Sequence, residues 1–145
     1  MNLCWEPVGV NSCAVKTVEQ AWNIVKAVNM DNVGLALDSM NLHMYGLLND
    51  FSAIKMIPKE KIFAIHINNC DDYPLGVLSN SEHRRFCDSG AIDLDSFLGN
   101  LKETGYKGMV SIETFRQEYW DKEPEWVIEE AYRTTYDKLK ACECL

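Results

Sequence analysis

Four side chains that could bind a divalent cation recur along the chain. Each of them follows a short apolar run, at the point where a β-strand would end: Glu6, Asp38, His66 and Glu113. Three carboxylates and one imidazole form an oxygen-rich ligand set, which suits six-coordinate Mn²⁺, Mg²⁺ or Co²⁺ and is also found around Zn²⁺. An acid at a strand end is often only a helix cap, and a single histidine is often a core residue. The recurrence of all four predicts a metal site and leaves the metal open.

Such a set of ligands can move a proton beside a carbonyl group. A divalent cation that bridges a substrate carbonyl and the neighbouring hydroxyl stabilises the enediolate that forms when an α-proton leaves, while a carboxylate removes that proton. A second carboxylate returns the proton. Return to the opposite face gives epimerisation, and return to the adjacent carbon gives aldose–ketose isomerisation. The residue types are compatible with both reactions.

Parallel strands are needed to bring these four residues together. Apolar runs of strand length predict strands at 3–6, 33–37, 62–67 and 109–112. The run at 62–67 is apolar except for His66, as in a strand buried on both faces of a parallel sheet. Because the carboxyl ends of the strands of a parallel barrel face one mouth, residues far apart in sequence can reach a single ion there.

Helical patterns alternate with these runs. Thr17 and Gln20 form a capping box at the start of the first predicted helix. Asp93 caps the third, Gly105 ends it, and Pro124 begins the fourth. The second has a helical face before Pro58, made of Leu47, Leu48, Phe51 and Ile54.

Four successive βα units without a hairpin signal predict an α/β fold with a parallel sheet. An eight-unit barrel needs about 250 residues, and this chain has 145. We therefore expect residues 1–145 to form a single domain, the C-terminal half of a TIM (β/α)8 barrel. Its open edges predict association, either with a missing N-terminal half or with another copy in a homo-oligomer such as a dimer.

Composition restricts the partners. The net charge of −8 makes nucleic acid a poor ligand, because binding to phosphates depends on Lys and Arg. No apolar run is long enough to cross a membrane. The six cysteines form no CxxC pair, which favours reduced thiols in the cytoplasm.

The loop 68–91 is longer than ordinary βα connections, which favours a function for it.

Several motifs, in order, resemble the sugar phosphate isomerase/epimerase family, which has the xylose isomerase-like barrel. They are WEPVG at 5–9, VGLALDS at 33–39, IHINN at 65–69, RRFCDSGAIDLDSFL at 84–98 and GYKGMVSIETF at 105–115. The resemblance implies that Glu6, Asp38, His66 and Glu113 are metal ligands. It also implies that Glu6 and Glu113 move protons and that Arg84 binds the substrate.

The chain departs from the family pattern at three places. Asn41 stands where the family often has a histidine, and Asn69 where it often has an acid. The glycine-rich turn after Arg84 reads Cys-Asp-Ser-Gly at 87–90. His43 is a candidate substrate contact, as is His83, although lone histidines in polar loops are usually exposed to solvent.

The leading functional hypothesis is a metal-dependent isomerase or epimerase of carbohydrate metabolism, acting on a small sugar, a keto-sugar or a related polyol. One alternative is an inosose-type dehydratase with the same metal and base. Another is a non-catalytic, truncated half-barrel that keeps the metal site. An apurinic-site nuclease shares the barrel but uses many more histidines than the three present here.

Overall fold

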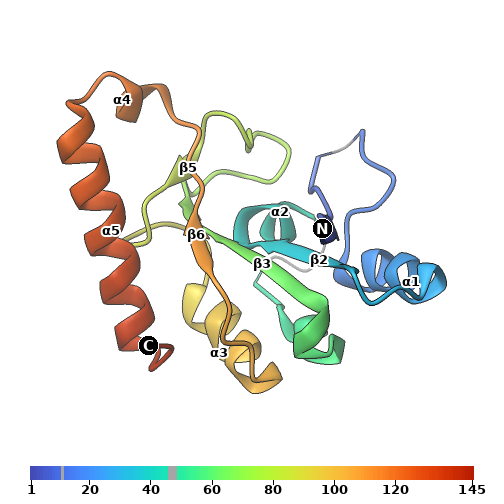
Figure 1. Ribbon diagram of the computed structural model, residues 1–145. Helices are drawn as coiled ribbons and strands as arrows, with labels where there is room; N and C mark the ends of the chain where they lie inside the picture. The colour runs from blue at the N-terminus through green and yellow to red at the C-terminus, as the bar shows by residue number, and fades with distance from the viewer. Residues whose placement is uncertain (11, 46–48) are drawn as a thin grey trace.

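A four-stranded parallel sheet forms the centre of the protein (Figure 1), in a computed structural model that describes residues 1–10, 12–45 and 49–145. The strand order follows the sequence, β1-β2-β3-β6. The strands are β1 (Leu3–Trp5), β2 (Val33–Asp38), β3 (Ile62–Ile67) and β6 (Val110–Ile112). All three neighbouring pairs are parallel, as the alternating pattern predicted.

The helices begin and end largely where the sequence signals place them. Helix α1 (Val18–Val28) has the predicted capping box, and α3 (Leu94–Thr104) is capped by the Asp93 side chain. Gly105 ends α3 with φ of 79°, a conformation that favours glycine. The other helices are α2 (Ser39–Met44), η1 (Ser52–Met56), η2 (Lys59–Lys61), α4 (Gln117–Trp120) and α5 (Pro124–Ala141).

The second predicted helix was partly wrong. Leu47 and Leu48 lie outside the described residues. Ile54 is buried as expected, but in the short 3-10 helix η1 and not in a continuous α-helix that runs to Pro58. The residue before a proline is pushed towards extended backbone, and Ile57 has φ −91° and ψ 121°. This proline effect stops helix growth at η1.

The loop 68–91 contains a short antiparallel ribbon that the sequence did not predict. Strand β4 (Asn69–Cys70) pairs with β5 (Arg84–Arg85), and the 13 residues between them contain no tight hairpin turn. The Asn69 side chain fixes the base of this loop: its Oδ1 accepts from the backbone N–H groups of Cys70 and Ile92. This contact gives Asn69 a structural role at a place where the family often has an acid.

Both edges of the sheet are open among the described residues. Figure 1 shows α5 beside β6 at one end of the sheet and α1 near the other end. Along β1, Leu3 and Trp5 are exposed, and Ile128 and Tyr132 of α5 are each 68% exposed. An open apolar cavity of about 480 Å³ lies between β6 and α5. No helix in the described part of the chain is long and apolar enough to span a membrane.

Candidate metal centre

The register of the sheet brings the ends of the strands together. Asp38 lies opposite His66 in the β2–β3 pair, after a register shift between Leu35 and Ala36. His66 in turn lies opposite Ser111, and the Glu113 N–H donates to the Ile67 carbonyl at 3.4 Å. The residues that follow the strands therefore face one edge of the sheet, as expected for parallel strands.

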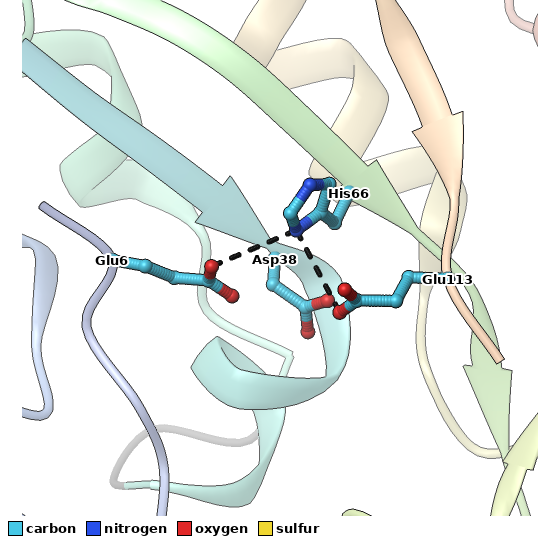
Figure 2. A group of neighbouring side chains, drawn as sticks. All are labelled: Glu6, Asp38, His66 and Glu113. Atoms are coloured by element: carbon cyan, nitrogen blue, oxygen red, sulfur yellow. Dashed lines mark ion pairs between the residues drawn. The ribbon is translucent and has the colours of Figure 1, made fainter. Parts of the chain in front are cut away.

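Glu6, Asp38, His66 and Glu113 form one cluster at this edge. One possible ligand atom from each residue lies within 4.8 Å of the others. The Nδ1 atom of His66 is 3.6 Å from Glu6 Oε2 and 3.6 Å from Glu113 Oε2. Figure 2 shows the two glutamates approaching His66 from opposite sides, with Asp38 between them. The structure thus brings together all four residues that were predicted as metal ligands.

The donor set of this cluster fits a divalent cation. The buried Nδ1 atom of His66 has no hydrogen-bond partner in the described structure, and buried polar atoms are rarely left unpaired in native proteins. Burial raises the pKa of Glu6, and the nearby charges of Asp38 and Glu113 raise it further, while His66 opposes them. A cation among these groups would satisfy the imidazole nitrogen and relieve the repulsion between the carboxylates.

Asp38 is held on both of its oxygens. Its Oδ1 accepts from the Asn41 N–H at 2.8 Å and so caps α2, while its Oδ2 accepts from Arg84 Nη1 at 2.7 Å. The helix-cap interpretation is thus correct for Asp38. It does not exclude metal binding, because an ionised carboxylate offers about four lone-pair sites.

Arg84 is buried, with only 1% of its surface exposed, so it is not a solvated loop arginine. Besides Asp38, its Nη1 donates to Asn68 Oδ1 at 2.7 Å and to the Glu113 carbonyl at 3.0 Å. Its guanidinium lies 5.2 Å from the centre of the Phe115 ring. Arg84 therefore anchors the long loop to two strand ends, and its contact with substrate stays a prediction.

The two loop histidines differ from expectation. His43 was expected to be exposed, but it is 4% exposed. It lies in α2, and its Nδ1 contacts Asn49 Oδ1 at 3.1 Å. It lines a cavity with Asn49 and Tyr73 that contains none of the four clustered residues. His83 is half-buried and accepts from the Ser79 N–H. A role of His43 in substrate binding is still a prediction.

Asn41 and Asn80 also belong to the centre. Asn41 Nδ2 donates to Glu6 Oε1 at 2.9 Å, and Asn80 Oδ1 accepts from Arg84. Asn80 and Phe115 line an open cavity of about 680 Å³. Asn41 was noted in the sequence only as a departure from the family pattern. Nothing in the sequence indicated that Asn80 belongs to the site, because it lies in a loop rich in polar residues, four positions before Arg84.

Comparison with known proteins gives relatives that are longer than this chain. The chain is 43% identical over 137 residues to inosose isomerase of Bacillus subtilis, covering 94% of this chain and 48% of that protein. It is 37% identical over 102 residues to 3-dehydroshikimate dehydratase of Pseudomonas putida, covering 70% of this chain and 16% of that enzyme. The chain thus spans about half the length of the inosose isomerases it matches.

Solved structures and the family comparison agree with this likeness. The IOLI protein, whose crystal structure has a bound zinc atom, superimposes with a TM-score of 0.90 and 41% identity, covering 97% of this chain and 50% of that chain. The described sheet accordingly corresponds to half of a TIM barrel. Residues 1–136 match the family described as xylose isomerase-like TIM barrel. The chain belongs to the xylose isomerase-like TIM barrel family.

Proposed function

We propose that this chain is the C-terminal half of a divalent-metal-dependent isomerase that acts on an inosose or a similar polyhydroxy ketone. The observation that carries the proposal is the cluster of Glu6, Asp38, His66 and Glu113, each within reach of one ion. The likeness to inosose isomerases supports the substrate class. The bound zinc of the IOLI protein supports a divalent metal without deciding between Mn²⁺, Mg²⁺, Co²⁺ and Zn²⁺.

We assign the following roles to the residues of the cluster and of the neighbouring cavity. Asp38 and His66 would hold the cation together with the two glutamates. When bound, the cation would stabilise the negative charge that develops on the carbonyl oxygen of the substrate. Glu113 and Glu6 flank His66 from opposite sides, so one carboxylate can remove a proton α to the carbonyl while the other returns it. Phe115 and Asn80 line the neighbouring cavity, which has room for a six-carbon ring.

We further propose that four more βα units cover the open edges. The exposed β1 strand and the apolar face of α5 support this, as does the greater length of the relatives. The six free cysteines support a reducing compartment such as the cytoplasm. The additional units are either an N-terminal half-barrel or a second copy of this chain.

Association can be measured directly. We expect the chain to sediment at twice its mass of 16.6 kDa, or to bind the N-terminal half of the Bacillus subtilis inosose isomerase. Tyr132→Lys places a charge on the exposed apolar face of α5 and should weaken either association. Glu129→Lys, at an exposed position on the same helix, is the matched control. A chain that stays monomeric and does not bind the N-terminal half would contradict the proposed assembly.

The function itself is tested by proton exchange. The chain, alone and with that N-terminal half, is incubated in D₂O with an inosose and Mn²⁺ and followed by nuclear magnetic resonance. We expect metal-dependent incorporation of deuterium beside the carbonyl and formation of an isomer. Glu113→Gln should slow exchange by about 10²–10⁴-fold, the usual contribution of a general base. Glu103→Gln, an exposed control, should not.

The same experiment separates the alternatives. Loss of water from the inosose would favour a dehydratase, the activity suggested by the likeness to 3-dehydroshikimate dehydratase. A metal-loaded chain that exchanges no proton, even with the N-terminal half, would be a non-catalytic half-barrel. That outcome would overturn the proposed reaction.

A further inference from the structure

Two asparagines connect the guanidinium of Arg84 with the carboxylate of Glu6. Arg84 Nε and Nη2 donate to Asn80 Oδ1 at 3.0 Å and 2.8 Å. Asn80 Nδ2 donates to Asn41 Oδ1. Asn41 Nδ2 then donates to Glu6 Oε1 at 2.9 Å. The four side chains form one continuous line of hydrogen bonds across the mouth of the half-barrel.

The chemistry at the two ends gives this line a single direction. A guanidinium can only donate, and an ionised carboxylate can only accept. Arg84 therefore requires the Asn80 oxygen to face it, which turns the Asn80 NH₂ towards Asn41. Asn41 must accept from Asn80, so its own NH₂ faces Glu6. Reversal of either amide would place two acceptors or two donors against each other.

The position of Asn41 is fixed by the backbone as well. Its N–H donates to Asp38 Oδ1 at 2.8 Å, at the first turn of α2. The loop that follows Glu6 lies directly against it, because a Cβ atom built on Gly9 would lie 2.2 Å from the Asn41 carbonyl oxygen. Only glycine allows this close approach. The backbone of Asn41, from which its side chain reaches Glu6, is therefore held between Asp38 and the loop that follows Glu6.

The hydrogen bond from Asn41 distinguishes the two oxygens of Glu6. Oε1 is engaged by the Asn41 amide, whereas Oε2 lies 3.6 Å from His66 Nδ1, which has no hydrogen-bond partner among the described residues. We propose that Asn41 and Asn80 are positioning residues that turn Glu6 Oε2 towards the cation and make this orientation depend on the loop that carries Asn80. The inference rests on metal binding as proposed above.

The dependence on the loop has a functional consequence. Asn80 lines the cavity of about 680 Å³, and its loop is anchored at the base by the β4–β5 ribbon. A ligand in this cavity that moves Asn80 would also move the hydrogen bond on Asn41, and so the carboxylate of Glu6. Occupancy of the cavity and the geometry of the metal centre are thereby linked.

The test compares Asn41→Leu and Asn80→Leu with the control Asn100→Leu, which changes an asparagine on α3 outside the centre. Titration calorimetry of the metal-free chains gives the Mn²⁺ dissociation constant. We expect it to rise about 10–100-fold in the first two variants, as is usual when a group supporting a metal ligand is lost. The visible absorption of bound Co²⁺ should change with it, and Asn100→Leu should match the parent in both measurements.

A rescue variant separates positioning from general support of the fold. A neutral imidazole has one donor and one acceptor nitrogen, so Asn41→His can keep the direction of the line and should bind Mn²⁺ as tightly as the parent. Circular dichroism checks that each variant is folded. If Asn41→Leu does not fold, the comparison is made with Asn80→Leu. If both leucine variants bind Mn²⁺ as tightly as the parent, this inference is wrong but the proposed function is not affected. A parent that binds no metal overturns the proposed function as well.

Discussion

Replacing Arg84 by methionine is expected to lower the free energy of unfolding by about 3–5 kcal/mol, measured in metal-free buffer with urea. Arg84 and Asp38 are both almost completely buried and joined at 2.7 Å. Removing the arginine leaves a carboxylate in the interior without its cationic partner, and leaves Asn68 and Asn80 without a donor. Such an uncompensated charge is far more costly than the loss of a surface ion pair.

The neighbouring arginine provides a matched control. Arg85 pairs with Asp71 at 2.8 Å, but its side chain is 38% exposed, so Arg85→Met should cost no more than about 1 kcal/mol. The double variant Arg84→Met/Asp38→Asn should recover part of the loss, because it removes the charge left unpaired. Equal effects of Arg84→Met and Arg85→Met would show that the buried pair has no special importance.

Binding of a divalent cation is expected to stabilise the parent chain by about 4 kcal/mol when the free metal is about a thousand times its dissociation constant. A cation that binds only the folded cluster shifts the equilibrium in this way. His66→Ala removes the one imidazole of the cluster and should abolish most of the shift in the unfolding midpoint. His83→Ala, which alters a half-buried histidine in the loop, should keep it. Equal shifts in both variants would place the metal elsewhere.

The sequence predicts the cluster well because its geometry depends on local and repetitive features. Apolar runs that end in Asp38, His66 or Glu113 specify strands of defined length, and parallel pairing brings their ends to one edge. The caps at Thr17 and Asp93 likewise depend on neighbours only three residues away. Interactions of this range can be inferred from the order of residues.

Contacts across long loops could not be inferred in the same way. Arg84 reaches Asp38 over 46 positions, and nothing near Arg84 in sequence indicates that the loop folds inward. Asn80 reaches the metal centre because the same loop folds inward and its side chain accepts from Arg84. The β4–β5 ribbon was missed because strands of two residues have no recognisable period, and the inward-facing His43 because its polar surroundings suggested a surface loop.

Elemental analysis of the purified chain, beside Glu113→Gln and His66→Ala, tests the metal centre most directly. After saturation with Mn²⁺ or Zn²⁺ and removal of free metal, the parent should retain one divalent ion per chain, and both variants should retain much less. Variants that keep the full metal content of the parent would contradict the assignment of these side chains as ligands.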